Sequence, residues 1–413
     1  MKPASDKRAL AFILLAMLID SMGFGIVMPV LPQLLVELTG VSVSQATRQA
    51  GWLLVTFAAL QFACSPLLGA LSDRFGRRPV LLLSMFAFSL NYVLMAAAPD
   101  LAWLFLGRAI AGISGALYAP ANAYIADITP PQARAQRFGL VGAAFGLGFI
   151  LGPALGGLIG QFGTRAPFYV AGALAGLNVI FGFFALPESL APQNRRAFSL
   201  ARANPFGALR ALARHKGVLP IIAVLVLWNL SVQVYPTTWA FWATLRFDFS
   251  PAEIGATLAY TGLLMASVQI FLTGRIVSAF GEQRAALFGF VSLIIPFLLY
   301  MIIDKGWMVY AVGLLAFFQG VGGPALNALI SQRVPSNAQG ELQGGVASLN
   351  GLAAIVGPWA FTETLSRATA PGLAHPFAGA AFVLAAAIAA CALLLFLFVT
   401  RKPAAVPQPD AVA

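Results

Sequence analysis

GALSDRFGRR, residues Gly69–Arg78, lies between two long apolar segments, Trp52–Leu68 and Val80–Ala98. A membrane-spanning segment that ends in a cluster of charges has reached water, and short loops rich in arginine mark the cytoplasmic side. The two glycines of the stretch allow close backbone approach and a tight turn. Asp73 stands among three arginines, so we expect it to form an ion pair. For the arginines alone, a loop that only fixes the topology is the alternative.

The composition is that of a membrane protein. Of the 413 residues, 60% are hydrophobic and 9% are charged, whereas a soluble domain carries about 25% charged residues. The formal net charge of +11 does not indicate nucleic-acid binding, because the basic residues lie in short loops between apolar runs. Cys64 and Cys391 lie inside apolar segments and predict neither a disulfide framework nor a metal site.

Twelve apolar segments are long enough to span a bilayer, which takes about 20 residues of helix. They are 9–36, 46–72, 79–98, 100–128, 131–162, 166–186, 217–246, 251–278, 283–303, 306–333, 336–365 and 374–400. Most Lys and Arg residues fall in the loops on one side, which predicts that both termini are cytoplasmic. The basic N-terminus precedes an apolar run without a cleavage site, so we expect a retained first helix rather than a signal peptide. We predict an all-α protein of a bacterial-type inner membrane.

The spans divide into two groups of six. The longest loop separates a predicted N-terminal six-helix bundle from a C-terminal one, with the boundaries 1–186, 187–216 (cytoplasmic linker), 217–402 and 403–413 (disordered tail). The groups repeat at one constant spacing, since Gly76 pairs with Gly281 and Pro153 with Pro358. Parallel repeats of this kind are related by an axis along the membrane normal and bind substrate near the midplane between them.

Asp20 and Arg108 are the candidate coupling residues. Asp20 lies about 17 Å into the first span at 1.5 Å per residue, near the centre of the bilayer. An ionisable group at that depth is costly and marks a substrate or proton pathway. Arg108 in the fourth span stays charged and needs a partner, and Asp20 is the deepest acid of the first half. The alternatives are a carboxylate that only binds water and a purely structural ion pair.

Span five carries the sequence GFILGPALGG. Its glycines form one thin face, and its proline interrupts the regular hydrogen bonding of the helix. Close helix packing of the GxxxG kind explains the glycines, and we expect them to pack against a neighbouring helix. The motif residues are Gly148, Gly152, Pro153, Gly156 and Gly157.

Polar side chains at helical spacing predict a substrate cavity. Gln319, Gly323 and Asn327 recur at i, i+4 and i+8, so we expect them to share one face of a helix. Each amide alone is typical of helix–helix hydrogen bonding, but together they exceed what packing requires. We predict an apolar, neutral cavity with aromatic rings for stacking. Its predicted lining residues are Gln61, Asn91, Asn122, Trp228, Asn229, Gln233, Gln269, Gln319, Asn327, Gln343 and Asn350.

The order of motifs resembles the twelve-span drug–proton antiporters of the major facilitator superfamily, and among them the tetracycline exporters. The resemblance rests on the pattern G-x-x-x-D-R-x-G-R-R, on LFLGRAIAGISGA (Leu104–Ala116), on the span-five motif and on IDSMGFGIVMPVLP (Ile19–Pro32). It implies that Asp20 and Arg108 serve proton transfer and that the span-five motif is an antiporter signature. It also implies a cytoplasmic gate formed by Gly69, Asp73, Arg74, Gly76, Arg77 and Arg78.

Three positions depart from the tetracycline exporters. Their third helix carries an essential Asp in a Ser-Leu-Asp-Tyr context, where this chain has Asn91. Their span-nine acid aligns with Leu293, and their span-eight histidine aligns with Met265. A cavity without these groups is poorly suited to a cationic metal–drug chelate, so the resemblance indicates the antiporter class more than the substrate.

We therefore predict a proton-coupled efflux antiporter that exports small, mostly apolar drug-like compounds by alternating access. The alternatives are a facilitator or uptake permease for a small metabolite, a tetracycline exporter proper, and a membrane receptor or scaffold. No catalytic constellation or phosphate-binding loop indicates an enzyme or direct ATP drive. We expect the proton as the coupling ion, no other cofactor, no nucleic-acid partner and a monomer. Asp73 should also meet the inner end of span eleven near Ser336.

Overall fold

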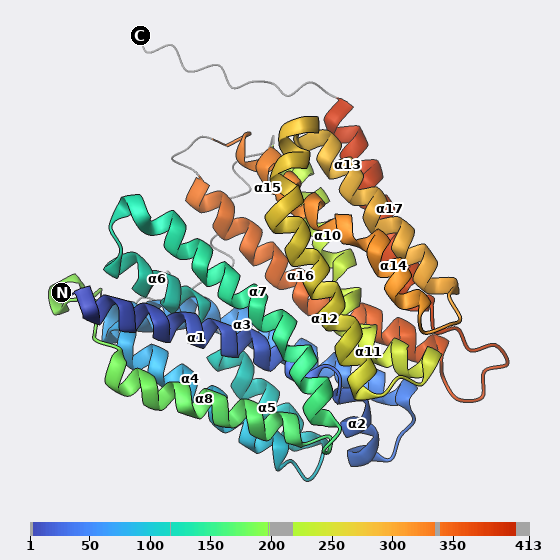
Figure 1. The fold of residues 1–413 in the computed structure, drawn as a ribbon, viewed down its shortest axis with the longest axis horizontal. Helices are drawn as coiled ribbons and strands as arrows, with labels where there is room; N and C mark the ends of the chain where they lie inside the picture. Colours follow the sequence, from blue (N-terminus) through green and yellow to red (C-terminus); the bar gives the residue numbers. More distant parts are fainter. Residues whose placement is uncertain (1–2, 116, 197, 199–217, 335–338, 402–413) are drawn as a thin grey trace. The chain divides into compact units, whose positions relative to one another are not determined.

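Helices make up most of the described part of the chain in the computed structural model, which covers residues 3–115, 117–196, 198, 218–334 and 339–401 (Figure 1). The first eight helices are α1 (Pro3–Val27), α2 (Leu31–Thr39), α3 (Val43–Phe75), α4 (Arg77–Ala96), α5 (Leu101–Ser114), α6 (Tyr118–Ile128), α7 (Arg134–Gly160) and α8 (Ala166–Ala185). The later helices are α10 (Leu219–Val232), α11 (Val234–Phe247), α12 (Pro251–Ser267), α13 (Thr273–Ile302), α14 (Met308–Ala316), α15 (Gly322–Ser331), α16 (Gln339–Ala368) and α17 (Ala380–Arg401). Short helical turns are η1 (Pro131–Ala133), η2 (Pro192–Asn194), η3 (Val268–Leu272) and η4 (Phe317–Val321).

The described helices account for twelve crossings of a membrane. Eleven helical segments are long and apolar enough to cross, and the longest, Pro251–Ile302, has 52 residues. A helix of that length would measure about 78 Å, more than twice the ~30 Å of a hydrocarbon core. It forms two crossings, because the backbone at Gly281 leaves the helical conformation with φ of 77°. Gly76, its predicted repeat partner, also has a positive φ, of 106°. The predicted twelve-helix all-α fold is confirmed.

Several spans that were predicted to be continuous are interrupted, and two of the breaks lie before prolines. In the predicted span 9–36, α1 ends at Val27, and in the predicted span 217–246, α10 ends at Val232. Pro32 and Pro236 follow these ends, and a proline has no N–H for the carbonyl four residues earlier and clashes with it. Proline alone does not decide the outcome, since Pro66 lies inside α3.

Contacts divide the chain into two compact units. Unit 1 comprises residues 1–205, 235–263 and 354–378, and unit 2 comprises residues 206–234, 264–353 and 379–413. Unit 1 therefore holds α1–α8 together with α11, most of α12 and the last part of α16. Most of the predicted linker and all of the predicted tail lie outside the described residues, and the predicted bundle boundaries stay predictions.

The free faces of the unit 1 helices are apolar. On α8, Leu177, Ile180 and Phe184 are 62%, 58% and 83% exposed and lie three or four residues apart. The opposite face of α8 is buried at Phe168 and Ala175. An exposed apolar stripe of this size is costly in water but suits lipid.

Glycines bring the backbones of α7 and α1 into contact. A Cβ atom on Gly152 would collide with the carbonyl oxygen of Met22, and one on Gly156 would collide with that of Ile26. Gly148 stands in the same relation to Leu18. Small residues at such a spacing allow close packing of helices in a membrane. The glycine face therefore fixes the position of α1 along α7.

We expect Gly152→Leu to destabilise the protein, because the added side chain has no space against α1. Overpacking of this kind costs about 1–3 kcal/mol or more. Gly142→Leu is the matched control on the same helix, since a Cβ there meets nothing within 4 Å. Thermal unfolding in detergent measures both variants. Equal unfolding temperatures would show that α1 and α7 are not packed through these glycines.

Candidate functional site

Three polar side chains lie near one another inside unit 1: Asp20 on α1, Tyr92 on α4 and Arg108 on α5. Tyr92 and Arg108 are 3% and 7% exposed, and Asp20 is half-buried. The Tyr92 hydroxyl packs on Gly23, one helical turn from Asp20. Both Asp20 and Arg108 lie within range of an electrostatic interaction with the Tyr92 phenol. The structure thus places the two predicted coupling residues around a tyrosine that the sequence analysis did not select.

Among the described residues, no hydrogen bond or ion pair joins Asp20 directly to Arg108. The Nε atom of Arg108 is buried without a partner, and so is the Oδ1 atom of Asn91. That Asn91 oxygen packs on Gly107, which precedes Arg108 in α5. It lies 2.9 Å from the point that a Cβ atom on Gly107 would occupy. The structural ion pair considered above is therefore not formed. Buried polar atoms without partners are costly and are typical of functional sites.

A pocket in unit 1 lies beside Arg108. Its lining residues are Phe24, Val27, Met28, Leu31, Leu54, Arg108, Pro236, Thr237, Ala240 and Phe241. Arg108 is the charged member of an otherwise apolar wall with one hydroxyl. None of the predicted amides lines this pocket, and the predicted lining of the substrate cavity stays a prediction. Phe24 also stacks on Phe149, with ring centroids 6.3 Å apart.

The span-five motif contacts two helices. Beside its glycine contacts with α1, a Cβ atom on Gly157 would lie 2.6 Å from the carbonyl oxygen of Pro251 in α12. A Cβ atom on Gly255 would collide with the carbonyl oxygen of Pro153. These close approaches agree with the packing expected of the motif. Its role in antiport stays a prediction.

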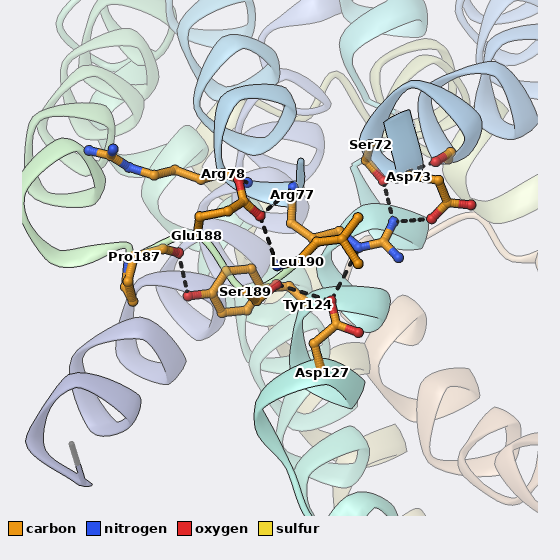
Figure 2. A network of polar contacts seen from close by, with 11 residues as sticks. Ser72, Asp73, Arg77, Arg78, Tyr124, Asp127, Pro187, Glu188, Ser189 and Leu190 are labelled. Carbon is orange, nitrogen blue, oxygen red and sulfur yellow. Dashed lines mark hydrogen bonds and ion pairs between the residues drawn. The ribbon is translucent and has the colours of Figure 1, made fainter. Parts of the chain in front are cut away.

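Arg77 is the centre of a polar network between α3 and α4 (Figure 2). Its Nη1 atom lies 2.6 Å from Oδ1 of Asp73 and donates a hydrogen bond of 2.6 Å to Oγ of Ser72. Its Nε atom lies 3.3 Å from Oδ2 of Asp127. Asp73 therefore pairs with an arginine, as expected. The other expected contact of Asp73, near Ser336, lies outside the described residues.

Glu188 caps the N-terminus of α4. Its carboxylate accepts hydrogen bonds from the backbone N–H groups of Arg77 at 2.8 Å and Arg78 at 3.2 Å (Figure 2). It also accepts one from the N–H group of Leu190 at 3.0 Å. A carboxylate at this position satisfies free N–H groups and the positive end of the helix dipole. The sequence analysis counted Glu188 in the linker and missed this role, although its position directly after span 166–186 was an available signal.

Two of the predicted gate residues contribute little to the network. Gly69 only accepts, with its carbonyl oxygen, a hydrogen bond of 3.0 Å from Oγ of Ser72. A Cβ atom on Gly69 would meet nothing within 4 Å among the described residues, which show no close backbone approach there. Arg74 is exposed and lies 5.0 Å from the centroid of the Phe75 ring. Gly76 is needed, because a Cβ atom there would collide with the Glu188 carboxylate. Arg78 donates a hydrogen bond of 2.7 Å to the carbonyl oxygen of Phe183.

The expected common face of Gln319 and Asn327 in unit 2 is wrong. Gln319 lies in η4, a 3-10 turn with about three residues per turn, so the i, i+4 phase is lost. Gln319 is buried and its Oε1 atom has no partner. Asn327 is exposed, and its side chain donates to the carbonyl oxygen of Gly323 in its own helix at 3.1 Å.

Several of the other predicted cavity residues join helices. In unit 1, Gln61 donates a hydrogen bond of 3.0 Å to the carbonyl oxygen of Gly115. In unit 2, Asn229 donates one of 2.8 Å to Oδ1 of Asn350. These contacts favour the helix-packing role that was the alternative for the amides. Of the remaining residues, Asn122 and Gln233 are half-buried, Gln269 and Gln343 are exposed, and Trp228 is buried with its ring centroid 4.8 Å from that of Phe290.

Residues 13–358 match the family model of the Major Facilitator Superfamily. The chain belongs to this superfamily. Over 371 residues, 89% of this facilitator and 93% of the relative, it is 40% identical to tetracycline resistance protein class C of Escherichia coli. It is 29% identical to multidrug resistance protein 2 of Bacillus subtilis strain 168, over 86% and 89% of the two chains.

A solved structure is similar to this chain in fold and sequence. The human organic anion transporter MFSD10 is 27% identical, with a TM-score of 0.68 over 96% of this facilitator and 100% of that chain. The predicted resemblance to drug-efflux carriers of this superfamily is confirmed by the resistance proteins. This protein is therefore a multi-pass membrane carrier of small molecules.

We expect Arg77→Gln to loosen the network, because Asp73, Asp127 and Ser72 lose their shared donor. Breaking a buried pair costs about 3–5 kcal/mol, and less here since both carboxylates are partly exposed. Arg74→Gln is the matched control, because that exposed side chain lies outside the network. The measurement is the rate at which a polar maleimide labels Leu190→Cys after both native cysteines are replaced by serine. Labelling should accelerate about tenfold or more, which corresponds to 1.4 kcal/mol.

Equal labelling rates in the Arg77 and Arg74 variants would contradict the assignment of Arg77 as the centre of the network. The segment after α8 would then be held by contacts that do not depend on Arg77, such as those of Glu188 with the N-terminus of α4 and of Tyr124 with Pro187.

Proposed function

We propose that this protein is a proton-coupled efflux antiporter of the bacterial inner membrane and that Asp20 binds the proton. The observation that carries the proposal is the half-buried Asp20 carboxyl, which lies near Tyr92 and Arg108 without a direct ion pair. A carboxyl held in a direct ion pair stays ionised, whereas one without such a partner is able to take up a proton. Membrane-embedded acids of this kind serve proton relays in transporters.

The same proposal places both termini and the Arg77 network on the cytoplasmic side. It is supported by the basic residues of the stretch Gly69–Arg78 and of the following linker. At the opposite end of α3, Ser44 donates a hydrogen bond of 2.7 Å to the carbonyl oxygen of Ser366. Arg48 lies 3.0 Å from Glu363 in the same seam. In the proposed cycle, this α3–α16 seam is the gate on the outer side, and one chain is the functional unit.

The proposed substrates are small, mostly apolar drugs. The names of the relatives, tetracycline resistance and multidrug resistance proteins, support export of drugs. The pocket beside Arg108 is apolar and carries a guanidinium instead of an acid, which disfavours a cationic substrate. The identity of 40% to tetracycline resistance protein class C makes export of tetracycline the second candidate function.

We expect Asp20→Asn to abolish export driven by a proton gradient while leaving substrate exchange without a gradient. An amide binds substrate in the same space but cannot carry a proton. The assay is transport of radiolabelled chloramphenicol, a neutral drug, in liposomes with and without an imposed pH gradient. Asp100→Asn is the matched control, because Asp100 only caps α5 and asparagine caps a helix as well. Full gradient-driven export by Asp20→Asn would refute the assignment of the proton to Asp20.

We expect weak or no tetracycline resistance from the wild type in a susceptible host. Asn91 offers hydrogen bonds where the resembling exporters have an acid, and a missing charge in a low dielectric costs a few kcal/mol. Asn91→Asp should raise the growth-inhibitory concentration of tetracycline, and Asn122→Asp on α6 is the control. Strong wild-type resistance that Asp20→Asn removes would show that the substrate argument is wrong while the antiport mechanism stands.

A further inference from the structure

Tyr92 is held from several sides. Its ring packs edge-to-face on Phe88, with centroids 5.1 Å apart. Gly172 of α8 lies against its Cβ atom, and Gly23 of α1 lies against its hydroxyl. The side chain is 3% exposed, so the hydroxyl has a fixed place next to α1. A ring fixed by packing can present its hydroxyl to a neighbour without further loss of side-chain entropy.

The hydroxyl lies at the level of the coupling residues. Asp20 is three residues before Gly23 and therefore on the same face of α1. Asn91, next to Tyr92 in α4, lies against Gly107, which precedes Arg108 in α5. Tyr92 thus stands where α4 faces both the helix that carries Asp20 and the helix that carries Arg108. Among the described residues, the Tyr92 hydroxyl has no hydrogen-bond partner in the protein.

We propose that Tyr92 is a positioning residue for proton coupling, whose hydroxyl donates a hydrogen bond to the ionised Asp20 carboxylate and loses it when Asp20 takes up a proton. The inference rests on the proposed role of Asp20. A phenol is a donor that does not titrate in the working range of a transporter. It therefore stabilises the ionised form of Asp20 without competing for the proton, and Arg108 adds the attraction of a buried positive charge.

Few other charged or titratable groups face this part of α1. Ser21 of α1 donates a hydrogen bond of 2.6 Å to the carbonyl oxygen of Phe145 in α7. Arg137 lies about 16 Å along α7 from Gly148, at 1.5 Å per residue. From α8 the one titratable side chain is Tyr169, which is 50% exposed. From α6, Tyr124 donates to the carbonyl oxygen of Pro187 at 2.8 Å.

The test is Tyr92→Phe in the full-length protein in liposomes, with Tyr169→Phe as the matched control. Infrared difference spectra follow the carboxyl C=O band that appears on acidification and that Asp20→Asn removes. In Tyr92→Phe the pH midpoint of this band should rise by about one unit, a tenfold higher proton affinity, because the ionised form loses a donor. The pH of half-maximal gradient-driven chloramphenicol export should rise with it. Tyr169→Phe should leave both midpoints unchanged.

A second variant keeps the hydroxyl and changes its place. The methyl group of Gly23→Ala would collide with the Tyr92 hydroxyl, so it should raise the midpoint in the same direction even if Tyr92→Phe folds poorly. Midpoints equal to the wild type in folded Tyr92→Phe and Gly23→Ala would overturn the inference while leaving Asp20 as the proton site. Absence of any band that depends on Asp20 would overturn the proposed function together with this inference.

Discussion

At Gly148, Gly152 and Gly156 the backbone of α7 touches the backbone of α1, and the arrangement around Asp20 depends on this contact. Because the contact involves backbone atoms, α1 cannot slide along α7 without losing it. The position of Gly23 relative to Tyr92, and hence of Asp20 relative to the phenol, follows from the same packing. A carboxyl in a membrane is costly unless its neighbours are placed in advance. The glycines provide that placement without adding a polar group.

The Arg77 network holds the ends of several helices together with few charged side chains. The turn at Gly76 leaves the first N–H groups of α4 without helical partners, and Glu188 accepts two of them. The buried guanidinium of Arg77 then satisfies Asp73 and Asp127 from one side chain. The network joins the ends of α3, α4 and α6 to the segment after α8. Displacing one of these ends would leave a charge without its partner, so they are held together as one body.

Long-range contacts explain where the sequence analysis succeeded and where it failed. Hydropathy and charge were sufficient for the twelve crossings, because lipid requires each span to satisfy its own backbone. The breaks before Pro32 and Pro236 were missed, since Pro66 shows that a proline inside a span is tolerated where packing allows it. Tyr92 and Glu188 were missed because their roles depend on helices far away in sequence. The turn at Gly281 was found because the repeat preserved Gly76 at the equivalent place.

The two polar contacts between α3 and the last part of α16, both inside unit 1, are weaker than the packing of α1 on α7. Arg48 is exposed by about half, so its pair with Glu363 contributes only about 0–1 kcal/mol. The hydrogen bond from Ser44 to Ser366 adds roughly 1 kcal/mol. A carrier must separate such seams in each cycle, and its conformations can differ by only a few kcal/mol if both are to be populated. Weak polar contacts at the end of α3 remote from Arg77 meet that requirement. The backbone contacts between α1 and α7 are of the kind that stays intact while the seam opens.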